Sequence, residues 1–223
     1  LSTNAGGSTI LNNGLVSTMG AQTFGDDVVL GDNATLGTTN SAISVAGSIS
    51  GSGKTLSIST GSGAINVAAI GASGASLGDI NFNSTSNTTL GGALYANTLS
   101  TNAGGSTILN NGLVTTTGAQ TFGDDVVLGI NTTLGTTNSA VSVAGSISGS
   151  GKALSISTGS GAINVAAIGA SGASLGDINF NSTSNTTLGG ALYANTLSTN
   201  AGGSTILNNG LVSTMGAQTF GDD

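Results

Sequence analysis

One stretch of sequence, LSTNAGGSTILNNGLV, begins at Leu1, again at Leu99 and a third time at Leu197. The chain of 223 residues is therefore a tandem array with a spacing of 98 residues. Repetition at a fixed long period is typical of proteins that stack one unit on the next. We predict one continuous array over residues 1–223, with copies at 1–98 and 99–196 and a partial copy at 197–223. Because the chain opens and closes inside a copy, we expect it to be a segment of a longer protein.

Within each copy, apolar and polar residues alternate over very short runs. Examples in the first copy are residues 42–45, 56–58, 65–67 and 80–82. Alternation with a period of two predicts half-buried β-strands, and no helical spacing is sustained. Gly, Asn, Asp and Ser separate the runs, and these residues favour tight turns. The sequence therefore predicts an all-β protein.

Two all-β architectures fit this pattern. One is a parallel β-solenoid, with three sides per turn and five turns of about 20 residues in each copy, or four longer turns. The other is a string of immunoglobulin-like sandwiches, because about 98 residues also suits such a domain. The aromatic content of 3% is low for a sandwich core, and residues 95–99 cross the copy junction without Pro or charge. We therefore favour the solenoid.

The composition excludes several functions. Charged residues make up 5% of the chain, which has two lysines, nine aspartates, and no Arg, Glu, His or Cys. Two lysines cannot supply the basic surface that nucleic acids need, and zinc sites need His or Cys. Carboxylate enzymes built on β-helices need Arg or His beside the acids. We therefore expect no nucleic-acid partner, no cofactor and no enzymatic activity. No apolar stretch is long enough to span a membrane.

The first two copies are nearly identical. We expect Ile43 and its counterpart Val141 to point inward, and the other differences to lie outward or at corners. The differing pairs are Ser17/Thr115, Met19/Thr117, Asp32/Ile130, Ala34/Thr132, Ile43/Val141 and Thr55/Ala153.

One part of the repeat resembles a known family. Residues 20–24 (GAQTF), 28–31 (VVLG) and 34–36 (ATL), followed by 41–60, are similar to runs in repeat-rich bacterial surface adhesins of the filamentous-haemagglutinin type. The resemblance implies secretion, a right-handed parallel β-helix and a role in attachment, aggregation or biofilm. The secretion domain of that family is not in this segment, so the export route stays open.

Aspartates gather in the sequence GDDVVLGDN. Carboxylates and turn carbonyls are ligands that Ca²⁺ accepts, although aspartate is also common in exposed turns. We favour exposed turns, because the repeated calcium-binding nonapeptide is missing and Ile130 replaces Asp32 in the second copy. The weak calcium candidates are Asp26, Asp27, Asp32, Asp124 and Asp125.

Other polar rows have two interpretations each. Asn81, Asn83, Asn179 and Asn181 either form amide ladders between turns or are ordinary surface residues. Tyr95 and Tyr193 follow Gly-Gly-Ala-Leu, where we favour packing at a corner over an exposed contact.

We expect the chain to be a non-catalytic shaft of a secreted or cell-surface adhesin, or of an extracellular filament. Solenoid ends without caps expose strand edges, so we also expect end-to-end self-association. The alternative is a binding module that recognises glycan, mineral or ice through outer rows of Thr, Asn and Asp.

Overall fold

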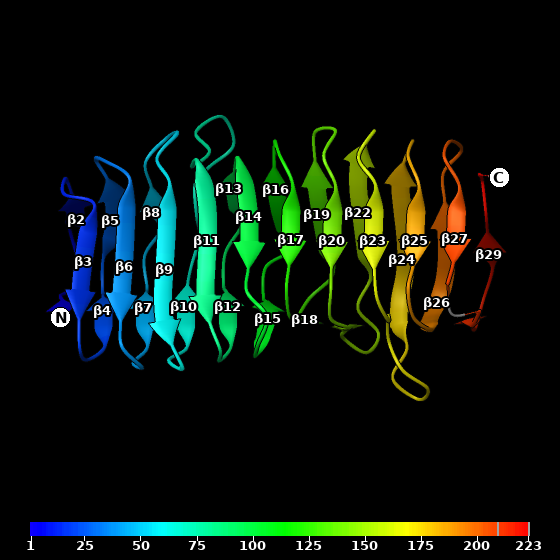
Figure 1. Ribbon diagram of the computed structural model, residues 1–223, viewed down its shortest axis with the longest axis horizontal. Helices are drawn as coiled ribbons and strands as arrows, with labels where there is room; N and C mark the ends of the chain where they lie inside the picture. Colours follow the sequence, from blue (N-terminus) through cyan, green and yellow to red (C-terminus); the bar gives the residue numbers. More distant parts are fainter. Residues whose placement is uncertain (209, 223) are drawn as a thin grey trace.

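The chain folds as a rod whose two ends carry the two termini (Figure 1). The computed structural model describes residues 1–208 and 210–222, and over these residues it contains strands and no helix. As the chain advances from left to right in Figure 1, the nearer strands run down the page and the rear strands run up, which is a right-handed winding. Every strand pairing between turns is parallel. The right-handed parallel β-solenoid is confirmed, and the immunoglobulin-like alternative is wrong.

Each turn contributes one strand to each of three faces, which we call A, B and C in chain order. Face A consists of β1 (Ser2–Thr3), β4 (Gln22–Phe24), β7 (Ile43–Val45), β10 (Ile65–Val67), β12 (Thr88–Leu90), β15 (Ser106–Leu109), β18 (Asp125–Leu128) and β21 (Ile147–Ser148). Single bridges through Ile168 then extend it to the first half of β26 (Leu192–Thr199) and to β28 (Val212–Thr214).

Faces B and C follow the same plan. Face B consists of β2 (Ser8–Leu11), β5 (Asp27–Leu30), β8 (Ile49–Ser50), a bridge through Ile70, β13 (Leu94–Ala96), β16 (Leu113–Thr116), β19 (Thr132–Thr136), β22 (Leu154–Gly159), β24 (Leu175–Ser182), the second half of β26 and β29 (Gln218–Thr219). Face C consists of β3 (Leu15–Thr18), β6 (Ala34–Thr38), β9 (Leu56–Gly61), β11 (Asp79–Ser84), β14 (Thr98–Thr101), β17 (Gln120–Phe122), β20 (Val141–Val143), β23 (Ile163–Val165), β25 (Thr186–Leu188) and β27 (Thr205–Leu207).

The copy length does not equal a whole number of turns. On face C the register climbs nine turns from Val16 to Leu207, so each turn takes about 21 residues. A copy of 98 residues therefore makes about four and two-thirds turns, between the four and the roughly five turns that the sequence left open. The corresponding strands β2, β15 and β27 lie on faces B, A and C respectively.

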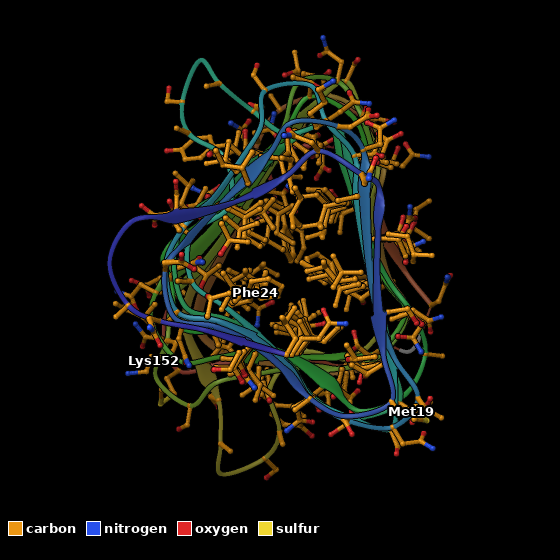
Figure 2. The ribbon with its side chains drawn as sticks, turned by 90° about the vertical axis from the view of Figure 1, so that its left-hand side faces the viewer. Met19, Phe24 and Lys152 are labelled. Atoms are coloured by element: carbon orange, nitrogen blue, oxygen red, sulfur yellow. The ribbon has the colours of Figure 1, made fainter. Side chains whose placement is uncertain are left out.

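Successive copies are consequently rotated about the rod by one face. The loop at residues 71–76 and its counterpart at 169–174 show this directly. Each is closed by a bridge between two alanines, Ala72 with Ala75 and Ala170 with Ala173. Seen along the rod, the teal loop of the first copy and the olive loop of the second project in different directions (Figure 2). The same sequence therefore faces different sides of the rod in successive copies.

Inward side chains fill the inside of the rod (Figure 2). They form one buried apolar cluster that runs from Phe24 to Leu197. Phe24, Phe82, Phe122 and Phe180 are its largest members, and each is fully buried. Burial of an aliphatic or aromatic side chain contributes roughly 1.5–3 kcal/mol. Because each side chain packs against the turns above and below, neighbouring turns supply much of this stabilisation.

Glycine is needed where one turn lies close against the next. A Cβ placed on Gly63 would lie 2.2 Å from the carbonyl carbon and oxygen of Ser41, in the turn below. Gly161 has the same relation to Ser139. Only a residue without a side chain allows the backbones to approach this closely.

The differences between the copies fall mainly where we expect them. Ile43 and Val141 are both fully buried, which confirms their inward orientation. Ile130 lies on the surface with 48% of its area exposed. The prediction is wrong for Ala34 and Thr132, which are both buried. Thr132 is tolerated there because its hydroxyl donates to the Ile130 carbonyl at 2.9 Å.

Candidate functional site

The two adjacent aspartates of the GDD sequence point in opposite directions. Asp26 is buried and accepts hydrogen bonds from the hydroxyls of Thr3 at 2.7 Å and Thr9 at 3.0 Å. In the second copy, Asp124 accepts from its two threonines at 2.8 and 2.9 Å. Asp27 instead faces outward and accepts from the backbone N–H of Ser48 at 2.7 Å. One aspartate therefore ties two strands to its own bend from inside, and its neighbour caps a turn from outside.

The remaining surface acid has a different partner again. Asp32 lies 3.9 Å from the Lys54 ammonium, and both side chains are well exposed. A pair of this kind contributes between about 0 and 1 kcal/mol. Across the part of the chain that the structure describes, no three acidic side chains are grouped as metal ligands. The structure thus gives separate partners to the calcium candidates, with Asp125 accepting from Ser146 as Asp27 does from Ser48.

The buried carboxylate of Asp124 has a perturbed pKa. Burial raises its pKa above the ordinary value of 3.8, and the hydrogen bonds from Thr101 and Thr107 offset part of that rise. The sequence did not indicate this burial. The threonines lie 23 and 17 residues before Asp124, so only the winding places them beside it.

Of the two interpretations of the asparagines, the structure shows ordinary surface residues and no amide ladder among them. The register places Asn81 between Ser57 and Ser100, and Asn179 between Ser155 and Ser198. Asn83 and Asn181 likewise lie opposite serines, Ser59 and Ser157. Because turn lengths vary between 19 and 24 residues, these four asparagines do not lie in a continuous row through successive turns.

The tyrosines are not corner residues. Tyr95 is the central residue of β13 and Tyr193 lies within β26. Both are half-buried, between inward-facing neighbours in the strand. Their rings therefore lie along the outer surface of a strand, and the corner prediction is wrong.

Each full copy also contains a buried glutamine that the sequence did not indicate. The Gln120 side chain is fully buried, and its amide nitrogen donates to the carbonyls of Val114 at 3.1 Å and Gly135 at 2.8 Å. Gln22 makes the same pair of bonds to Val16 and Gly37. Since glutamine is common on surfaces, nothing in the local sequence distinguished these two.

A groove of about 690 Å³ follows the corner between faces A and B in the second half of the rod. It lies beside the loop at residues 169–174. Its polar side chains come from successive turns, and an exposed methionine borders it. These residues are Asn131, Ser150, Ser174, Asp177, Asn195 and Met215.

Asp177 is the charged group of this groove. One of its carboxylate oxygens, Oδ1, accepts from Asn195 Nδ2 and from Thr196 Oγ1, both at 2.7 Å. These hydrogen bonds lower its pKa below the ordinary value of 3.8, so the group is an anion over most of the pH range. Asn131 Oδ1 is engaged as well, because it accepts from the backbone N–H of Ala153 at 3.0 Å.

The corresponding corner of the first copy is built differently. There, Asp79 accepts from Asn97, and Asn97 Oδ1 accepts in turn from the Thr117 hydroxyl at 2.8 Å. Met215 stands where Thr117 stands, and a thioether has no hydrogen to donate. Thr55 of the first copy is likewise replaced by the smaller Ala153. The groove was not predicted, and the positions at which the copies differ are the sequence signal that could have indicated it.

Comparison of the chain with protein-family models, with curated protein sequences and with solved structures finds no match. Within residues 1–208 and 210–222, no helix has the length and apolarity required to cross a membrane.

Proposed function

We propose that this chain is a non-catalytic structural shaft, part of a secreted or cell-surface bacterial adhesin or of an extracellular filament. The observation that carries the proposal is the continuity of the winding through both copy junctions. Strand β14, which contains the start of the second copy, pairs with β11 below and β17 above without interruption. Strand β26 contains the start of the third copy and pairs in the same way.

The winding converts sequence into length. Parallel strands in a sheet lie about 4.8 Å apart, so a copy of four and two-thirds turns adds about 22 Å to the rod. The apolar cluster inside the rod continues through the copies, so the copies do not form separate globules. A longer array of such copies would be a long, stiff rod.

The secreted or cell-surface location is supported by the resemblance of residues 20–60 to filamentous-haemagglutinin-type adhesins. The non-catalytic role is supported by the composition, which offers no His, Cys or Arg.

The shaft proposal is tested by the length of arrays of two, four and six copies, measured by small-angle X-ray scattering. We expect the rod to lengthen by about 22 Å per copy at a constant cross-section. An array that bends at each copy junction, as linked beads do, would contradict the proposal.

Self-association at the ends is a second part of the proposal. The first turn exposes Leu15 and Met19, and the last turns expose Leu207, Met215 and Phe220. These side chains surround strand edges without a further turn to cover them, and such edges pair with other chains. We expect the 223-residue chain to form end-to-end oligomers as its concentration rises, in sedimentation velocity experiments. A strictly monomeric chain at millimolar concentration would argue against this association.

The alternative role, a binding module, is not supported by the outer rows of side chains, but the groove beside Asp177 gives it some support. The outer row of face A mixes Thr23, Ser44, Asn66, Thr89 and Ile108, which is not the uniform threonine row that an ice or mineral lattice would need. The groove beside Asp177 is a different kind of feature.

A further inference from the structure

We infer that the groove at the corner between faces A and B binds a neutral carbohydrate through its hydroxyl groups. The inference does not rest on the winding, because it concerns the outer surface of the rod, but it shares Met215 with the C-terminal end that the self-association part of the proposal uses. The groove's volume of about 690 Å³ lies in the range of small-ligand sites.

The groove leaves two hydrogen-bond acceptors open. Of the Asp177 oxygens, Oδ1 receives both side-chain bonds, from Asn195 and Thr196, which leaves Oδ2 as an acceptor for a ligand. The side-chain oxygen of Asn195, Oδ1, is a second acceptor. Met215 cannot donate a hydrogen bond to it as Thr117 donates to the side-chain oxygen of Asn97.

The same groove also offers donors. Asn131 uses its oxygen to cap Ala153, so its NH₂ group is directed to other acceptors. The hydroxyls of Ser150 and Ser174 can donate as well as accept. Donors and acceptors are therefore mixed along the groove. A row of ligand hydroxyls matches this mixture, because each hydroxyl both donates and accepts.

The negative charge of the groove and of the chain favours a neutral ligand. The groove contains one carboxylate and the chain has a net charge of −7, so an acidic saccharide or a phosphate would be repelled. A single carboxylate is also too few for a Ca²⁺ site, which takes roughly six to eight oxygen ligands. The exposed Met215, at 76% of its area, adds a flexible apolar wall for the C–H face of a sugar ring.

The residue differences between the copies also favour binding at this groove and not at the corresponding corner of the first copy. Thr117, from the start of the second copy, donates to Asn97 at the corresponding corner of the first copy, and Thr55 has a methyl and a hydroxyl where the second copy has Ala153. Met215 lacks the hydroxyl donor that Thr117 supplies, and Ala153 lacks the methyl and hydroxyl of Thr55. The first replacement leaves the side-chain oxygen of Asn195 without that donor, and the second puts a smaller side chain in the lining of the groove.

The experiment uses the only two methionines of the chain as reporters. Met19 and Met215 occupy corresponding positions, and both are largely exposed. In the chain labelled with ¹³C at the methionine methyl groups, maltotriose, cellotriose and N,N′,N″-triacetylchitotriose are titrated separately to millimolar concentrations. We expect at least one of them to shift the Met215 signal in a saturable way and to leave Met19 unchanged.

Matched variants locate the site. Asp177→Asn keeps the size of the side chain and removes the charge-assisted acceptor, so affinity should fall at least about tenfold. Ala153→Thr gives the second copy the residue of the first and should weaken binding to a similar degree. Asp79→Asn and Thr55→Ala change the corresponding corner of the first copy and should leave the Met215 titration unchanged.

Three results would overturn the inference. They are no saturable Met215 shift with any of the three trisaccharides, equal shifts of Met19 and Met215, and an undiminished titration in Asp177→Asn. A Met215 shift produced by CaCl₂ alone, without a response to any trisaccharide, would replace the carbohydrate with a cation.

Discussion

The middle of the rod and its C-terminal end have nearly the same sequence in different surroundings. Phe122 and Leu109 are fully buried in the second copy, whereas their counterparts Phe220 and Leu207 are 42% and 45% exposed in the last turns. The difference is the turn that follows, which covers the first pair and is missing for the second. Burial in this fold is therefore a property of the neighbouring turn, and identical residues contribute unequal amounts of stability.

The largest effect should come from truncating the core in these two places. Phe122→Ala removes a fully buried ring between two turns and should lower the free energy of unfolding by about 3–5 kcal/mol. Phe220→Ala, in the exposed last turn, should cost less than about 1 kcal/mol. Urea denaturation of both variants checks the comparison, and equal losses would show that the ends are as well packed as the middle.

A smaller difference should follow from adding a side chain where turns approach each other. Gly63→Ala forces a Cβ against the Ser41 carbonyl, and the resulting backbone shift should cost about 2–4 kcal/mol. A Cβ added to Gly20, in the first turn, would meet no atom within 4 Å, so Gly20→Ala should change stability by less than about 1 kcal/mol. Thermal unfolding followed by circular dichroism measures both variants, and an unchanged midpoint for Gly63→Ala would contradict the close approach.

The same comparison between the middle and the end of the rod can be made for hydrogen bonds, with the buried Gln120 and its exposed counterpart Gln218. Gln120→Ala breaks two bonds in the interior and should cost about 1–3 kcal/mol. Gln218, its exposed counterpart near the end, makes one long bond of 3.3 Å to Val212, and Gln218→Ala should cost less than about 0.5 kcal/mol. Chemical denaturation of the two variants tests this difference. A similar loss of stability in Gln120→Ala and Gln218→Ala would contradict the prediction.

The smallest effect should be on how the free energy of unfolding changes with pH. Because the pKa of Asp124 is raised above 3.8 in the folded chain, the folded state binds more protons than the unfolded state just above pH 3.8. The free energy of unfolding should therefore fall as pH rises through that window, and Asp124→Asn should remove this contribution. Denaturation at a series of pH values measures the slope.

Asp177 provides a control of opposite sign for this measurement. Its pKa is lowered, so its contribution to stability is lost as pH falls below 3.8. Asp177→Asn should therefore flatten the profile only on the acid side. If Asp124→Asn does not change how the free energy of unfolding depends on pH just above 3.8, the buried Asp124 carboxylate does not cause that dependence.

Much of the fold was predictable because it depends on local patterns. Alternating residues such as Ile43, Ser44 and Val45 predict a strand with one buried side, and three of these strands make one short turn. The repeat begins again at Leu99 and Leu197, which predicts stacking along one axis. The candidate groove was not predictable in this way, because Asp177, Asn195 and Met215 come from three successive turns.

The sequence by itself determined that this chain is an all-β array with aliphatic side chains on the buried side of its strands, since a period of two and Gly-rich corners leave no room for long helices, and it favoured the solenoid over a string of sandwiches. Only the tertiary structure decided that 98 residues make four and two-thirds turns, which gives each copy a different face of the rod. It also decided that Asp26 points inward and Asp27 outward. The physical reason is that a side chain's surroundings are completed by residues about 21 positions away, and the exact length of each turn determines which residues those are.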